Sequence, residues 1–135
     1  MKTAFIFVLY KTPKSEINRL KKEVKELRIT NCELYFIDNS ENGQGFAAGA
    51  NKGLREAIKD GCELFAIANP DITLVKLVTF DQFDSFDKFD IFGFSMHQQG
   101  KTYYGGQIDK WRMSGGLNQE KLKSRFVATD FVSGS

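Results

Sequence analysis

Two short apolar runs in this chain each lead into a carboxylate, with a glycine-rich segment between them. Leu34–Ile37 is followed by Asp38, and Leu64–Ala68 is followed by Asn69-Pro70-Asp71. Continuous apolar runs are typical of buried parallel strands. Such strands share one carboxyl edge, where open α/β sheets bind their ligands. Because carboxylate oxygens suit hard divalent cations, we expect a site for a nucleotide diphosphate and a cation at this edge.

The first part of the chain supplies a strand and a helix. Ala4–Tyr10 is a continuous apolar run that predicts a central strand covered on both faces. Apolar residues then recur at helical spacing over Ile17–Leu27, with Ser15 as the expected N-terminal cap. The basic residues of this segment, Arg19 among them, are expected to form a solvated outer face, and a membrane or phosphate patch is the alternative.

The second helix is predicted over Phe46–Lys59, with Gly61 as its C-terminal cap. The second and third strands are expected at Glu33–Asp38 and Leu64–Ala68. Strands that alternate with helices through short connections favour βαβ units. The fold class is therefore α/β, with a mostly parallel sheet flanked by helices.

The pattern changes after Asp71. Between Phe80 and Asp90 a phenylalanine recurs every third residue and is followed each time by aspartate, which favours one buried helical stripe over a calcium site. Four further segments are expected in order: a fourth strand over Ile91–Met96, a turn and short β segment over Gln98–Gly106, a loop or weak helix over Gly115–Ser124, and a last apolar segment over Phe126–Val132.

Composition limits the classes of function. The chain has 135 residues, enough for a single domain over residues 1–135, and its net charge of +2 is too balanced for nucleic acid as the main partner. Cys32 and Cys62 lack metal-site spacing and are expected to be reduced, with a disulfide or metal pair as the alternative. No signal peptide or membrane span is recognisable, so a cytoplasmic location is expected. Peripheral contact with the inner face of a membrane through the basic helix face stays open.

The glycine-rich segment formally matches a dinucleotide-binding fingerprint. Gly43-x-Gly45-x-x-Ala48 fits the pattern GxGxxG/A, and Glu63 lies 20 residues beyond Gly43. In that fold, however, the glycines follow the first strand directly, whereas here they follow the second. Glu63 also opens its strand, although the ribose-binding acid normally ends one. A nicotinamide cofactor is therefore the less favoured interpretation.

The same stretch resembles the nucleotide-sugar-binding core of glycosyltransferase family 2, especially its rhamnosyltransferase-like branch. The resemblance rests on three ordered elements that approximate "DNxS", "GFaxGxNxG" and "NPD". It is strongest over residues 33–74, and Asp130-Phe131-Val132-Ser133-Gly134 is similar to the family's later "dfvsGa" segment. The matching residues of the three elements are Asp38-Asn39-Ser40, then Gly45, Phe46, Gly49, Asn51 and Gly53, and finally Asn69-Pro70-Asp71.

The resemblance implies a GT-A fold and inverting transfer of a sugar from a UDP- or dTDP-type donor to a polysaccharide or glycolipid acceptor. Asp71 would be the ligand of Mg²⁺ or Mn²⁺, and Asn69 stands where the family's DxD motif has its first acid. The residues that would bind the nucleotide sugar are Leu9, Tyr10, Asp38, Asn39, Gly45, Gly49, Asn51 and Asn69, with Lys11 at the end of the first strand beside them.

One element of the family pattern is missing. The family's general base is usually an aspartate in an acidic motif beyond the "vsGa" segment, and this sequence ends at Ser135 before such a motif. Asp130 precedes the segment and is expected to be a strand-edge residue, so no catalytic residue is assigned and the fold is expected to be truncated at its C-terminus. A non-catalytic nucleotide-binding or scaffold fragment is the alternative function. His97, Tyr103, Tyr104 and Trp111 are expected to be ordinary exposed or packing residues, with an acceptor groove as the alternative role.

Overall fold

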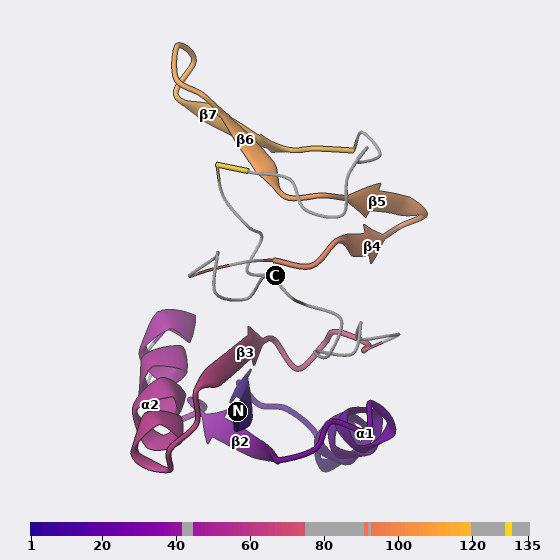
Figure 1. The fold of residues 1–135 in the computed structure, drawn as a ribbon. Helices are drawn as coiled ribbons and strands as arrows, with labels where there is room; N and C mark the ends of the chain where they lie inside the picture. Colours follow the sequence, from indigo (N-terminus) through magenta and orange to yellow (C-terminus); the bar gives the residue numbers. More distant parts are fainter. Residues whose placement is uncertain (42–44, 75–90, 92, 120–128, 131–135) are drawn as a thin grey trace. The chain divides into compact units, whose positions relative to one another are not determined.

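The computed structural model of the chain describes residues 1–41, 45–74, 91, 93–119 and 129–130. The chain divides into two compact units, residues 1–83 and 84–135. The described part of the first unit contains β1 (Thr3–Leu9), α1 (Lys14–Glu26), β2 (Cys32–Asp38), α2 (Phe46–Lys59) and β3 (Leu64–Ala68) (Figure 1). The described part of the second unit contains β4 (Met96–Gln98), β5 (Lys101–Tyr103), β6 (Gly106–Asp109) and β7 (Ser114–Leu117).

The first unit is built on a parallel sheet with the strand order β2-β1-β3. In the register of the sheet, Leu9 of β1 pairs with Asp38 of β2, and Phe7 pairs with Ala68 of β3. All three strands therefore point their carboxyl ends toward one edge. The predicted α/β class, with a parallel sheet flanked by helices, is confirmed for this unit. The predicted bounds of β3 and α2 are also confirmed, and those of β1 and β2 are within one residue.

The two faces of β1 are covered by different helices. Every residue of β1 is buried. Ala4 and Ile6 pack with Ala57 of α2, whereas Phe5 and Phe7 pack with Leu20 and Val24 of α1. Side chains alternate across a strand, so the continuous apolar run of β1 supplies both cores at once. The sheet therefore lies between α1 and α2 (Figure 1).

Two glycines let α2 lie close against the sheet. A Cβ atom at Gly53 would stand 2.4 Å from Cγ2 of Ile6, and one at Gly49 would stand 2.6 Å from Cγ1 of Val8. Glycines four residues apart lie on the same helix face. Residues 49 and 53 thus act in packing, and the helix backbone occupies the space that side chains would need.

The ends of the helices differ in how well the sequence predicted them. Gly61 has a φ of +77°, its N–H donates to the carbonyl of Ile58, and the N–H of Cys62 donates to that of Ala57. This is a Schellman motif, so the predicted cap of α2 is confirmed. The prediction that Ser15 caps α1 is wrong. Pro13 takes the cap position with an extended ψ of 148°, so Ser15 lies inside the first turn, and no side chain caps the helix.

Arg19 ties α1 to the segment that follows β3. Its guanidinium donates to the carbonyls of Pro70 and Ile72 at 2.8 and 2.9 Å, and to the carboxylates of Glu16 and Glu23. The expectation of a solvated outer face is therefore wrong at this position, because one guanidinium fork can serve several acceptors at once. Burial raises the pKa of Glu23, but hydrogen bonds from the Leu74 amide and from Arg19 outweigh it and leave that pKa lowered.

The described residues of the second unit form two antiparallel hairpins, β4–β5 and β6–β7. The prediction of a strand over Ile91–Met96 is wrong, since β4 begins only at Met96. Gln99 and Gly100 both have positive φ, which is the backbone of a tight two-residue turn, and this turn fixes the pairing of the residues next to it. The predicted turn and β segment after Gln98 are thus confirmed. The loop predicted from Gly115 is wrong as far as Leu117, because pairing with β6 makes this stretch a strand.

Several expectations lie on residues outside the described ranges. They are the phenylalanine–aspartate repeat of residues 80–90, residues 120–124, and most of the apolar segment 126–132.

Cys32 and Cys62 are free thiols, as expected. Among the helices of the described residues, none has the length and apolar character that crossing a bilayer requires.

Replacing Gly53 with alanine should destabilise the first unit. Alanine favours a helix over glycine by about 1 kcal/mol. The new Cβ would, however, press on Ile6, whose side chain is fully buried and cannot move aside. We expect a net loss of about 1–3 kcal/mol in the free energy of unfolding, measured by urea titration. The control is Asn51→Ala on the exposed side of the same helix, which should be neutral or stabilising. Equal stability of Gly53→Ala and the parent would contradict the close packing.

Replacing Arg19 with lysine should also lower stability, by about 1–2 kcal/mol at pH 7 after allowance for partial exposure. Lysine keeps the charge but lacks the planar fork that reaches both carbonyls and both carboxylates. Because the folded pKa of Glu23 is lowered, its contribution to stability is present at neutral pH and is lost as the pH falls through that pKa. The difference between parent and variant should therefore shrink below about pH 4. Arg55→Lys on the exposed face of α2 should change little. A difference that stays undiminished in acid would contradict the ion-pair account, because only the two carbonyl bonds of Arg19 are independent of pH.

Candidate functional site

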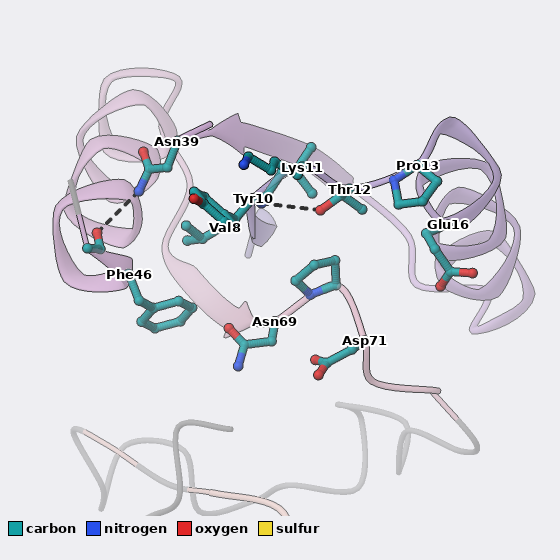
Figure 2. A pocket seen from close by; sticks show the side chains of 13 residues that line it. Val8, Tyr10, Lys11, Thr12, Pro13, Glu16, Asn39, Phe46, Asn69 and Asp71 are labelled. Atoms are coloured by element: carbon teal, nitrogen blue, oxygen red, sulfur yellow. Dashed lines mark hydrogen bonds between the residues drawn. The ribbon is translucent and has the colours of Figure 1, made fainter. Parts of the chain in front are cut away.

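A cavity of about 720 Å³ opens at the carboxyl edge of the parallel sheet. This volume falls within the range of small-molecule sites, about 300–1,000 Å³. Its walls come from the exits of all three strands and from the start of α2 (Figure 2). The lining residues are Val8, Leu9, Tyr10, Lys11, Thr12, Pro13, Glu16, Asn39, Gly45, Phe46, Asn69, Pro70 and Asp71.

The exit of β1 forms one wall. The N–H of Tyr10 donates to Oγ1 of Thr12 at 3.2 Å, and the N–H of Lys11 donates to Oγ of Ser40 at 2.8 Å. Lys11 has a φ of +49°, so the chain turns sharply here, and its ammonium lies 5.5 Å from the centre of the Tyr10 ring. The turn therefore places an aromatic face and a positive charge together at the cavity.

The exit of β2 contributes Asn39, which is buried. Its N–H donates to the Leu9 carbonyl at 3.0 Å, and its Nδ2 donates to the Gly45 carbonyl at 3.2 Å. Through its backbone N–H and its side-chain amide, Asn39 thus connects β1, β2 and the start of α2. Asp38, one residue earlier, is exposed, and hydrogen bonds from the hydroxyl and the N–H of Ser40 lower the pKa of its carboxyl group. It is consequently a fixed anion beside the cavity.

The start of α2 reaches the cavity with Gly45 and Phe46. Gly45 occupies the cap position without a side-chain cap, and the first turn contains no acidic residue. The positive end of the helix dipole is therefore not offset by a carboxylate of its own helix. A negatively charged group in this part of the cavity would be stabilised.

The exit of β3 contributes Asn69 and Asp71 to the cavity. Asn69 is half-buried, Asp71 is exposed, and both lie along the cavity (Figure 2). The bonds from Arg19 to the carbonyls of Pro70 and Ile72 hold the backbone on both sides of Asp71. Glu16 also lines the cavity, but its carboxylate accepts from Arg19 at 2.8 Å. Asp71 is thus the carboxylate of the cavity that carries no ion pair to Arg19.

This donor set fits a cation that arrives with a phosphate ligand. In the described part of the chain, no three side chains of His, Cys, Asp or Glu gather into a group that could hold a metal. Mg²⁺ usually binds through one or two carboxylates together with substrate phosphates and water. Asp71, with the amide oxygen of Asn69 nearby in sequence, could provide the protein's part of such a shell.

The structure brings together most of the residues that the sequence singled out. Leu9, Tyr10, Lys11, Asn39, Gly45, Asn69 and Asp71 all line the cavity, whereas Asp38, Gly49 and Asn51 are not among the lining residues. Gly49 lies within α2, where a Cβ atom would stand against the side chains of Asn39 and Val8. Asn51 is exposed on α2.

Six lining residues were not among the predicted binding residues: Val8, Thr12, Pro13 and Glu16, together with Phe46 and Pro70, which the sequence named only as parts of the motif. Most of them are chain neighbours of predicted residues, so adjacency to a strand end was the available signal. Glu16 is different, because it reaches the cavity from the first turn of α1 and no sequence motif pointed to it.

The aromatic and histidine candidates lie in the second unit. His97 is exposed in β4, and its Nδ1 lies 3.1 Å from Oγ1 of Thr102. Tyr103 and Tyr104 are half-buried, and Trp111 is 99% exposed. The partial burial of the two tyrosines agrees with a packing role, whereas the ring of Trp111 lies almost entirely in solvent.

Comparisons with known proteins leave the family open. Family models, curated proteins and solved structures were compared with the chain, and none of them matches it.

Proposed function

We propose that the first unit binds a nucleotide-diphosphate sugar and that the protein is an inverting glycosyltransferase of the family 2 type with a GT-A fold. The donor would be of the UDP or dTDP type, and the acceptor a polysaccharide or glycolipid. One observation carries the proposal: the ends of three parallel strands form a single cavity that holds most of the residues of the nucleotide-sugar motif.

The walls of the cavity suit the parts of such a donor. Tyr10 offers an aromatic face to the base. Asp38 lies outside the lining, but it pairs with Leu9 at the same sheet edge and would accept hydrogen bonds from a base or ribose that reaches it. Lys11 and the start of α2 both favour the negative diphosphate. Asp71 and Asn69 would hold Mg²⁺ or Mn²⁺. When bound, the cation would neutralise charge on the leaving nucleotide.

A dinucleotide-binding function fits less well. In that fold a glycine-rich turn directly follows the first strand and receives the pyrophosphate. Here β1 continues into Tyr10-Lys11-Thr12-Pro13, which has no glycine, and Gly45 follows β2 instead.

A donor-binding module without transfer chemistry is the second candidate. Of the two carboxylates that line the cavity, Glu16 is paired with Arg19 and Asp71 is the proposed metal ligand. The described lining residues therefore leave no carboxylate to act as the general base that inverting transfer requires. Release of UDP from a UDP-sugar in the presence of acceptor would support the transferase, and tight binding without turnover would support the module.

The metal role of Asp71 can be tested by calorimetry of UDP and dTDP binding with and without Mn²⁺. In Asp71→Asn the affinity measured with Mn²⁺ should fall by about tenfold or more, because the amide removes the anionic ligand. Affinity measured without Mn²⁺ should hardly change, since the nucleoside contacts remain.

The matched control is Glu63→Gln, which removes an exposed carboxylate at the opposite edge of the sheet, just before β3. Its affinity should equal that of the parent. Equal loss in both variants would reject Asp71 as a specific ligand. Failure of the parent to bind either nucleotide would reject the proposed function as a whole.

A further inference from the structure

The β6–β7 hairpin ends in an exposed apolar tip. The tip consists of Lys110, Trp111, Arg112 and Met113, which connect Asp109 to Ser114. The exposed fractions of Trp111 and Met113 are 99% and 92%. Every residue from 107 to 116 is exposed, so no described side chain covers the tip. Trp111 and Met113, flanked by Lys110 and Arg112, are therefore open to a partner.

The tip has a defined conformation. Oδ1 of Asp109 accepts hydrogen bonds from the N–H groups of Trp111 and Arg112 at 3.0 and 3.2 Å. Met113 has a φ of +49°, which closes the turn. Aspartate commonly fixes turns in this way. The hairpin therefore presents the Trp111 ring outward on a held backbone, and little ordering is needed when a partner binds.

The residues of the tip have the chemistry of a membrane interface. Tryptophan prefers the boundary between lipid and water, because its ring is apolar and its N–H is polar. Methionine adds a flexible apolar side chain beside it. Lys110 and Arg112 alternate with these two residues, and juxtamembrane basic residues are attracted to anionic lipid headgroups.

We propose that the tip of the β6–β7 hairpin is a docking site for an anionic lipid surface, with Trp111 and Met113 entering the headgroup region and Lys110 and Arg112 contacting the headgroups. This inference is independent of the proposed nucleotide site. It also assigns the membrane contact to the second unit, whereas the sequence left the basic face of α1 open as an alternative contact.

A lipid surface accounts for the tip better than a nucleic acid does. Segment 109–113 contains Asp109, Lys110 and Arg112 and therefore carries a net charge of only +1. Oδ2 of Asp109 also lies 3.8 Å from Nε of Arg112 and partly offsets its charge. Nucleic acids are bound mainly through several phosphate contacts along a basic groove. Docking on a lipid surface combines apolar burial of Trp111 and Met113 with the attraction of Lys110 and Arg112 to anionic headgroups, and it needs no groove of phosphate contacts.

Trp111 is the only tryptophan of the chain, so its fluorescence reports on the tip alone. The full chain is titrated with phosphatidylcholine vesicles, with vesicles containing phosphatidylglycerol, and with single-stranded DNA. We expect a blue shift with the anionic vesicles only, and quenching by lipids brominated in the upper acyl chain. An unchanged spectrum with the anionic vesicles, or a response to DNA instead, would overturn the proposal.

Two charge variants distinguish the tip from α1 by vesicle sedimentation. Lys110→Gln/Arg112→Gln and Lys22→Gln/Lys25→Gln each lower the net charge from +2 to 0. The first should lose about tenfold or more in affinity for anionic vesicles, and the second should keep the parent affinity. Trp111→Ala should also lose binding, without loss of folding because its ring is exposed. Equal loss in both double variants, or loss in the α1 variant only, would overturn the assignment to the tip.

Discussion

Burial of β1 on both faces is the constraint on which the first unit depends. Its seven residues are all buried. One face is covered by α1 and the other by α2, so the chain must cross from one side of the sheet to the other between the two helices. The connections after β1 and β2 therefore diverge at the carboxyl edge, and the divergence of such connections opens a crevice there. The cavity lies at this edge.

The walls of the cavity are held by polar bonds between strand exits. Asn39 connects the exits of β1 and β2 with the start of α2, and Ser40 accepts from the backbone of Lys11. Arg19 performs the same task on the side of β3. Preorganised walls of this kind reduce the ordering that a ligand must bring about when it binds.

The two proposals concern different units and different chemistry. The cavity of the first unit offers aromatic, cationic and carboxylate groups to a polar donor, whereas the hairpin tip of the second offers tryptophan and methionine to lipid. A glycolipid acceptor stays in a membrane, and a nucleotide sugar arrives from solution. A protein that contacts the bilayer through a hairpin would remain where such an acceptor lies, so the two proposals are compatible although neither requires the other.

The sequence by itself determined the βαβαβ order of the first unit, because β1, α2 and β3 are long local patterns with clear ends. It also determined which strand exits carry Asn39, Asn69 and Asp71, since a parallel sheet brings its carboxyl ends together. Only the tertiary structure decided that Gly49 packs under Asn39, that Glu16 reaches the cavity, and that Arg19 binds the β3 exit. It also placed β4 and β7 in hairpins, where exposed strands lack a strong hydrophobic pattern. These features depend on contacts between residues far apart in sequence or on the geometry of tight turns, which local periodicity does not encode.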